Sequence, residues 1–235
     1  MQENNFVGRE DELRELARYL EEALSGRGGV YFVTGEAGSG KTALVYHFLT
    51  QALAAHPDLV VAAGTSNSQT GAGDPYLPFR EVMAMLTENG SGRESTTETP
   101  SENAARLRTV MVRSVQVLVE VAPELVGLFV PFGKLLGGLG KAVMVKAGWM
   151  DRLDDLVERS ADVTAEQSRI FEQYTAFLQK LSEEIPLVLF LDDLQWADDA
   201  SLGLLFHLAR RVDGYRILIL GAYRATDLAL GRNGG

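Results

Sequence analysis

A glycine-rich stretch constrains the fold of this chain more than any other eight residues: Gly35-Glu36-Ala37-Gly38-Ser39-Gly40-Lys41-Thr42. A β-branched and aromatic run, residues 30–34, precedes it, and residues 43–49 follow with apolar positions at helical spacing. This order predicts a strand, a tight loop and a helix. Such a loop can bring its N–H groups onto phosphate oxygens, while Lys41 reaches the β and γ oxygens and the Thr42 hydroxyl binds Mg²⁺. The alternative is a glycine-rich turn in an ordinary α/β unit, and the flanking segments favour phosphate binding over it.

Composition limits the remaining choices. With 235 residues, 46% of them hydrophobic, the chain is long enough for one sizeable α/β domain that carries an insertion. A formal charge of −10 argues against direct nucleic-acid binding by this segment, since phosphate backbones are bound by clustered Lys and Arg. Cysteine is absent, which excludes disulfides and thiolate metal sites, and the three histidines are too scattered to suggest a metal site. No signal-peptide pattern opens the chain, so a cytoplasmic location is expected.

The first half of the chain alternates helical and strand patterns. Residues 10–24 predict an amphipathic surface helix, residues 59–64 a buried parallel strand, and residues 78–86 a further helix. Residues 88–103 are rich in Ser, Thr, Glu and Gly without an apolar period, and we expect them to be mobile.

The middle of the chain is helical in pattern but uneven. The apolar spacing of residues 104–147 is interrupted at Pro123. The apolar segment 121–147 is interpreted as packing within the protein or against a neighbouring domain; a surface that binds a partner or a membrane is the alternative, and its lysines and glycines do not favour a membrane-spanning helix. A capping box at residues 164–167 predicts a helix that Pro186 ends.

A second informative run is the apolar segment 187–191, a buried-strand sequence that ends in Asp192 and Asp193. In a phosphate-loop enzyme the strand beside the loop must deliver an acid to the Mg²⁺ that Thr42 also holds, and Asp192 fits that position. Asp193 could then orient or deprotonate the attacking water. The alternative for the pair is turn initiation.

The end of the chain predicts a last helix and a last strand. Asp199 or Ser201 is expected to cap a helix that runs through Arg211, and residues 216–222 predict a strand that ends near Arg224. In a parallel sheet Arg224 would lie at the same edge as the loop and could contact the γ-phosphate; a solvated arginine is the alternative. Trp196 is interpreted as a packing residue.

Several motifs together resemble the AAA-type ATPase domain of STAND signalling proteins, in particular the subgroup in large bacterial LuxR-type transcriptional regulators. They are FVGRE at 6–10, the phosphate loop, DPYLPFR at 74–80, LDDLQWAD at 191–198 and GAYR at 221–224. The resemblance spans most of the chain and implies a P-loop NTPase three-layer sandwich, with a mostly parallel sheet and a helical insertion, that acts as an ATP/ADP switch with Mg²⁺.

The resemblance also implies roles for individual residues. Lys41, Asp193 and Arg224 would be catalytic, Arg224 as the first sensor, and Thr42 and Asp192 would hold the metal. Val7 and Gly8 would lie by the adenine, and Arg9 near the nucleotide; docking of the chain start is the alternative reading. The predicted nucleotide-binding residues are Val7, Gly8, Arg9, Gly35, Glu36, Ala37, Gly38, Ser39, Gly40, Lys41, Thr42 and Ala43.

The chain departs from the family pattern after Arg224, because no later strand, helical lid with a second sensor, or winged-helix segment follows. We therefore expect a single truncated ATPase domain, 1–235. Its parts are 1–87 with the Walker A loop, 88–163 with the linker and helical insertion, and 164–235 with the Walker B strand and first sensor. The expected partners are nucleotide, the missing lid, winged-helix or repeat domains, and further copies in a nucleotide-dependent homo-oligomer. Without a lid, hydrolysis is expected to be slow.

Three functions remain open at this point. The first is an Mg²⁺-dependent ATPase switch in a bacterial STAND-type signalling or transcriptional regulator. The second is a scaffold that holds ADP and oligomerises with negligible turnover. The third is a phosphotransferase, which lacks support because no acceptor pocket or lid signature is recognisable. A GTPase is not favoured, since no Asn-Lys-x-Asp motif occurs.

Overall fold

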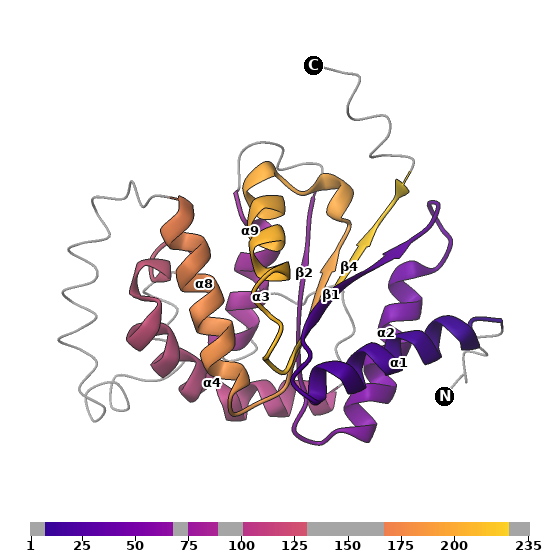
Figure 1. Ribbon diagram of the computed structural model, residues 1–235, viewed down its shortest axis with the longest axis horizontal. Helices are drawn as coiled ribbons and strands as arrows, with labels where there is room; N and C mark the ends of the chain where they lie inside the picture. The colour runs from indigo at the N-terminus through magenta and orange to yellow at the C-terminus, as the bar shows by residue number, and fades with distance from the viewer. Residues whose placement is uncertain (1–7, 68–74, 89–100, 131–166, 226–235) are drawn as a thin grey trace, which may run out of the picture.

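The computed structural model describes residues 8–67, 75–88, 101–130 and 167–225. Helices and strands alternate along the chain, which confirms the α/β class and the fold of a P-loop NTPase (Figure 1). The elements are α1 (Glu10–Leu24), β1 (Gly29–Thr34), α2 (Lys41–Ala55), β2 (Val60–Thr65), α3 (Leu77–Thr87), α4 (Ser101–Val121), the 3₁₀ turn η2 (Pro123–Leu125), α8 (Gln167–Ser182), β3 (Leu187–Asp192), the 3₁₀ turn η3 (Leu194–Trp196), α9 (Asp199–Ala209) and β4 (Ile217–Tyr223).

The four described strands form one parallel sheet in the order β1-β4-β3-β2. Consecutive strands β1 and β2 are therefore at opposite edges, and β3 and β4 fill the space between them. This corrects one expectation: the strand that carries Asp192 is not the neighbour of β1, because β4 lies between them. The carboxyl ends of all four strands still lie at the same end of the sheet, because the strands are parallel.

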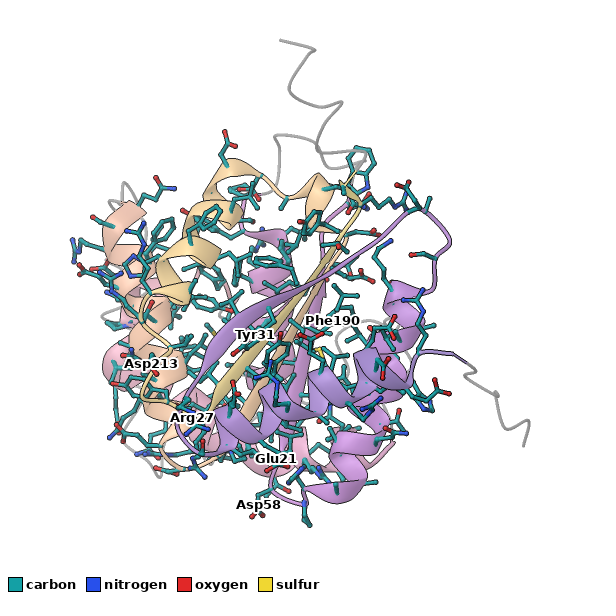
Figure 2. The ribbon with its side chains drawn as sticks, turned by 45° about the vertical axis from the view of Figure 1, so that its right-hand side comes forward. Glu21, Arg27, Tyr31, Asp58, Phe190 and Asp213 are labelled. Atoms are coloured by element: carbon teal, nitrogen blue, oxygen red, sulfur yellow. The ribbon has the colours of Figure 1, made fainter. Side chains whose placement is uncertain are left out.

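Helices cover both faces of the sheet and make a three-layer sandwich. In Figure 1, α1 and α2 lie on one side and α3, α4, α8 and α9 on the other. Each face has its own hydrophobic core, because alternate residues of a buried strand point to opposite faces. Leu189 faces the core of α3, α4, α8 and α9, whereas its neighbour Phe190 faces the core of α1 and α2. Figure 2 shows the sheet from the side of α1 and α2, with Tyr31 and Phe190 labelled.

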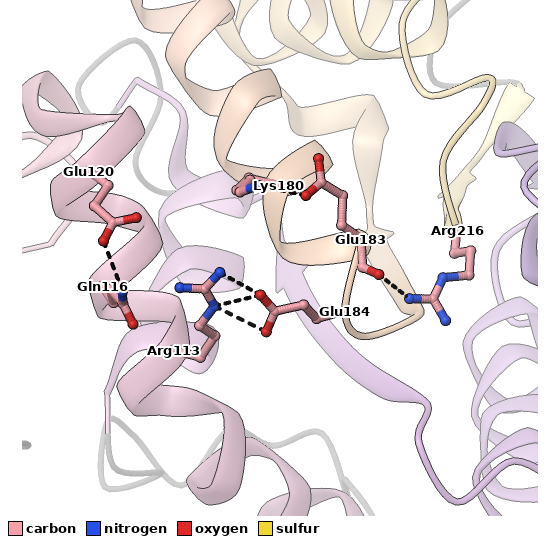
Figure 3. A network of polar contacts seen from close by, with 7 residues as sticks. All are labelled: Arg113, Gln116, Glu120, Lys180, Glu183, Glu184 and Arg216. Carbon is pink, nitrogen blue, oxygen red and sulfur yellow. Dashed lines mark hydrogen bonds and ion pairs between the residues drawn. The ribbon is translucent and has the colours of Figure 1, made fainter.

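Polar contacts join the helices at the amino-terminal end of the sheet (Figure 3). Arg113 on α4 donates from Nε to both carboxylate oxygens of Glu184, at 2.9 and 3.1 Å. Arg216, directly before β4, donates to the main-chain oxygen of Glu183 at 2.7 Å. These contacts join the turn between α8 and β3 to α4 on one side and to the residue before β4 on the other, and so fix the position at which β3 begins.

Three expectations about element boundaries need correction or remain outside the structure. Residues 88–103 were expected to be mobile, yet Glu88 and Asn103 are buried and α4 begins at Ser101; residues 89–100 lie outside the described residues. The cap of α9 is Asp198 rather than Asp199 or Ser201, because its side chain accepts from the Ser201 N–H. The apolar segment beyond residue 130 and the capping-box residues 164–166 also lie outside the described part.

The described helices include none with the length and apolar character needed to cross a membrane.

Candidate functional site

The loop between β1 and α2 has the backbone of a phosphate cradle. Gly38 and Gly40 have φ angles of 74° and 80°, in the left-handed region that costs other L-residues about 1–2 kcal/mol. Nothing lies within 4 Å of the place where a Cβ would stand at either residue, so conformation and not crowding requires glycine. Gly40 is also the N-cap of α2 and supplies no side-chain cap. The first N–H groups of α2 therefore donate no hydrogen bond to a capping side chain. Helix N-termini that bind anions commonly have such uncapped N–H groups.

Lys41 lies across this loop. Its Nζ donates to the main-chain oxygens of Gly35 and Glu36, both at 2.9 Å, and the residue is only 8% exposed. An ammonium group has three N–H donors, so these two contacts leave one for a ligand. The lysine is thus held at the mouth of the loop with its charge directed at the place where phosphate oxygens would bind.

Ser39 provides a further indication that the loop is built for a ligand. Its Oγ is buried and, in the described part of the chain, has no hydrogen-bond partner. Buried hydroxyl groups in folded proteins are nearly always paired, so an unpaired one in this loop indicates a site for a further partner. A phosphate oxygen or an ordered water would satisfy it.

Thr42 and Asp192 meet although 150 positions separate them in the sequence. The Thr42 hydroxyl donates to Asp192 Oδ2 at 2.8 Å. Burial raises the pKa of the Asp192 carboxyl, while the bonds from Thr42 and the Asp193 N–H oppose that rise. A hydroxyl and a carboxylate are ligands that Mg²⁺ accepts, and it normally completes its shell with water and nucleotide phosphates.

Thr42 and Asp192 are not part of a larger cluster of metal-ligating side chains in the described part of the chain. Within the described ranges, no group of three or more His, Cys, Asp and Glu side chains is placed to hold a metal ion.

Asp193 has a different environment from its neighbour. Its backbone is left-handed, with φ 53° and ψ 39°, and its side chain is 37% exposed, whereas Asp192 is 8% exposed as a residue. The unusual backbone turns the chain away from β3 and lets the Asp193 N–H donate to Asp192 Oδ1 at 2.8 Å. Two consecutive carboxylates are thereby separated, one beside Thr42 and one facing solvent.

Arg224 directly follows β4, so it lies at the same carboxyl end of the sheet as the two aspartates. Its Nη2 lies 3.9 Å from Asp193 Oδ1, and its main-chain N–H donates to Gln195 Oε1 at 3.1 Å. Gln195 in turn donates from Nε2 to Asp193 Oδ1 at 2.7 Å. The structure thus brings Asp193, Gln195 and Arg224 into one polar group.

The start of the chain lies against the phosphate loop. Arg9 donates from Nη2 to the Ser39 main-chain oxygen at 2.8 Å and from Nη1 to Glu12 at 3.1 Å. Gly8 has φ 89° and bonds through its N–H to Glu10. Val7 lies outside the described residues. The contact of Arg9 is with the loop itself, so this arginine can hold the loop as well as face a nucleotide.

Sequence reasoning missed several residues here. Gln195 was not singled out, although it lies two positions after Asp193 in the motif that carries both acids. Asp198 accepts from Ser201 N–H at 2.9 Å and from Tyr76 N–H at 3.3 Å, so it joins the start of α9 to the start of α3. Trp196 was interpreted as a packing residue, yet it is 46% exposed.

Tyr46 is another group that the sequence did not reveal. Its hydroxyl is buried and has no hydrogen-bond partner among the described residues. Burial raises its pKa, and the charges of Asp192 and Glu81 raise it further. The hydroxyl thus stays protonated in the neighbourhood of the predicted metal-binding carboxylate.

Comparisons with known proteins agree with this geometry. The family model described as AAA ATPase domain matches residues 5–220, which is most of the chain and includes every site residue above except Arg224. The search of curated proteins finds no match.

Proposed function

Because the chain belongs to the AAA ATPase domain family, we propose that it is an Mg²⁺-dependent ATP-binding and hydrolysing switch of a bacterial STAND-type signalling or transcriptional regulator. The family is one of nucleotide-binding ATPases, and the site geometry supports ATP turnover in this member. The observation that carries the proposal is the contact between Thr42 and Asp192, because it joins the phosphate loop to the acidic strand end at 2.8 Å.

Each neighbouring group has a task in phosphoryl transfer. The loop N–H groups and the third N–H of Lys41 would bind the phosphate oxygens, and Thr42 with Asp192 would hold Mg²⁺. When bound, Mg²⁺ neutralises charge that develops on those oxygens. Asp193 would accept a hydrogen bond from the attacking water and orient it, and Arg224 would stabilise negative charge on the transferred group. Positioning and electrostatics supply most of the rate in this reaction.

The signalling role extends this chemistry. A γ-phosphate that contacts both the loop and the ends of β3 and β4 would stabilise one arrangement of these segments, and its loss would release it. The motifs shared with STAND regulators support this part of the proposal. It predicts that ATP and ADP produce different patterns of limited proteolysis.

Nucleotide-dependent stabilisation is the first test. At about 100 times its dissociation constant a ligand adds about 2.7 kcal/mol to folding, so the melting temperature should rise by about 5–10 °C with ATP and Mg²⁺. GTP should give a smaller rise, and Lys41→Ala should remove the rise. Lys180→Ala is the matched control, because Lys180 is exposed and bonds only within α8 and its end, to Glu183. If neither ATP nor ADP stabilises the parent protein, nucleotide binding by this chain is refuted.

Hydrolysis is tested separately through Asp193. We expect Asp193→Asn to keep ATP binding and to lower phosphate release at least about 100-fold, since general bases contribute about 10²–10⁴-fold. A parent protein that binds ADP tightly but releases no phosphate above background would instead support the ADP-holding scaffold.

A further inference from the structure

We infer that Gln195 is a positioning residue for hydrolysis, which fixes the carboxylate of Asp193 and the end of β4 in one arrangement. The inference rests on the proposed ATPase function and adds to it a residue that the family match does not assign. Among the described residues, the hydrogen bonds of the Gln195 side chain go to Asp193 and Arg224 and not to the loop or the predicted metal ligands. Its effect would pass through Asp193 and Arg224.

The hydrogen bonds determine which way the Gln195 amide points. Arg224 offers a main-chain N–H, which can only donate, so Gln195 Oε1 must face it. Nε2 then faces Asp193 Oδ1, and an ionised carboxylate can only accept. Both ends of the amide are therefore used in the single orientation that satisfies both partners, and no side chain of equal length other than glutamine supplies a donor and an acceptor.

The two carboxylate oxygens of Asp193 have different surroundings. Oδ1 accepts from Gln195 at 2.7 Å and has the Arg224 guanidinium 3.9 Å away. For Oδ2 the described residues provide no hydrogen-bond partner, so this is the oxygen left to accept from water. Because Oδ1 is held by a donor, the carboxylate cannot rotate freely, and Oδ2 is kept in one direction.

The local backbone makes this support necessary. Asp193 has left-handed angles that a non-glycine residue adopts at some cost, and the chain then turns through η3. The turn is closed by main-chain bonds from Trp196 N–H to Asp193 and from Ala197 N–H to Leu194. Gln195 lies inside that turn, so its side chain can reach back to Asp193 and across to β4. A simple turn contact would satisfy one end of the amide, whereas here both ends are bound to residues of the predicted catalytic group.

Two variants separate the contacts of the amide. Gln195→Ala removes both, while Gln195→Glu keeps an acceptor for the Arg224 N–H and places a carboxylate against Asp193. We expect both variants to lower kcat by about 10- to 100-fold, as small misplacements of reacting groups do, with the dissociation constant for ATP within about twofold of the parent. Gln116→Ala is the matched control: its amide bonds one carboxylate, Glu120, on the far helix α4 (Figure 3), and kcat should not change.

The outcomes that overturn the inference are specific. Parent-like kcat in Gln195→Ala would show that the amide does not position Asp193. Parent-like kcat in Gln195→Glu would show that only the tie to β4 matters. Equal losses of ATP affinity and kcat would indicate a merely structural role.

A measurement without turnover keeps the inference testable if the parent proves inactive, which would refute only the proposed function. The side-chain amide of Gln195 in the ¹⁵N-labelled full chain should change its NMR shifts and exchange faster with water in Asp193→Ala, because its acceptor is gone. Resonances that do not respond to Asp193→Ala would overturn the inference.

Discussion

The two consecutive aspartates at the end of β3 show how strongly the surroundings of a residue decide its task. Asp192 is nearly buried and bonded to Thr42, whereas the Asp193 side chain is 37% exposed and bonded to Gln195. The first arrangement suits a metal ligand that must exclude competing water, and the second suits a group that receives a water. The left-handed backbone at Asp193 ends β3 and begins the turn η3, in which Gln195 reaches back to the Asp193 carboxylate.

Asp192→Asn should stabilise the metal-free protein. The folded-state pKa of Asp192 is raised, chiefly by burial, so its charge opposes folding once the pH exceeds its unfolded value near 4. Asparagine keeps a carbonyl oxygen for the Asp193 N–H, and its NH₂ group can donate to the Thr42 hydroxyl, without that charge. We expect a higher melting temperature at pH 7 in EDTA and a difference that shrinks as the pH falls to 4 and below, where the parent carboxyl becomes protonated in both states.

The same variant should lose the additional stabilisation that Mg²⁺ gives in the presence of ATP, because an amide is a weaker magnesium ligand than a carboxylate. Differential scanning calorimetry with and without MgATP measures both effects. A lower melting temperature of Asp192→Asn in EDTA at pH 7 would mean that the carboxylate's hydrogen bonds outweigh its burial.

The sequence predicted that Asp192 and Arg224 would lie at the same end of the sheet, because residues at the carboxyl ends of parallel strands meet there. Sequence reasoning missed Gln195 and misassigned the cap of α9 to Asp199 or Ser201. Both depend on the turn after β3, where Asp193 is left-handed and the true cap, Asp198, is one residue earlier. Sequence pattern does not determine which of several adjacent polar residues turns toward a given N–H.

Among the elements, β2 has the most unusual surroundings, because side chains satisfy its outer edge. Its N–H groups at residues 61, 63 and 65 each donate to a side chain: Asn103 Oδ1 at 3.0 Å, Met85 Sδ at 3.2 Å and Glu81 Oε2 at 2.8 Å. Asn103 also donates to the Val61 main-chain oxygen at 2.8 Å, so its amide pairs with the strand as a neighbouring strand would. Because these backbone groups are already bonded, the outer edge of β2 cannot pair with a strand of another chain.

Removal of the Asn103 amide should therefore destabilise the fold. Asn103→Ala leaves one N–H and one C=O of Val61 buried without partners, and each unsatisfied group costs about 1–3 kcal/mol. We expect a loss of about 2–4 kcal/mol in the free energy of unfolding, measured with urea. Gln116→Ala on the same helix removes an exposed amide and should change stability by less than about 0.5 kcal/mol. Equal effects of the two variants would show that the edge contact is not important for stability.

Most helices and strands were predictable because each has a clear apolar period, and α1 was predicted with its observed bounds. The start of α4 was not. Its first turn includes Asn103, which belongs to a polar stretch without an apolar period and is fully buried by hydrogen bonds to β2. Periodicity detects apolar burial, and it gives no signal for a polar side chain that is buried because it completes a sheet.

For the molecule as a whole, the sheet separates two hydrophobic cores and connects them. Its order, β1-β4-β3-β2, could not be predicted from apolar runs alone, since such runs show that strands are buried but not which strands pair. The order explains why Asp192 is two strands from β1 and still contacts Thr42: α2 begins at the end of β1 and extends its first turn toward β3. The site therefore forms only when all three crossover connections are in place: from β1 to β2, from β2 to β3 and from β3 to β4.

The two cores should unfold together, because every central strand contributes residues to both. Leu49 on α2 is 1% exposed in one core, and Phe177 on α8 is fully buried in the other. Truncation of either to alanine should cost about 2–5 kcal/mol. It should also shift a single urea transition, seen at the same midpoint by far-UV circular dichroism and by tryptophan fluorescence. Val112→Ala, at a residue 42% exposed on α4, is the control and should have a small effect.

If Leu49→Ala melted α1 and α2 in a separate earlier transition, the phosphate loop, which precedes α2, could open without global unfolding. A shared transition instead means that the contact between Thr42 and Asp192 forms only when both cores are intact, so mutations far from the site in either core would weaken nucleotide binding through stability alone.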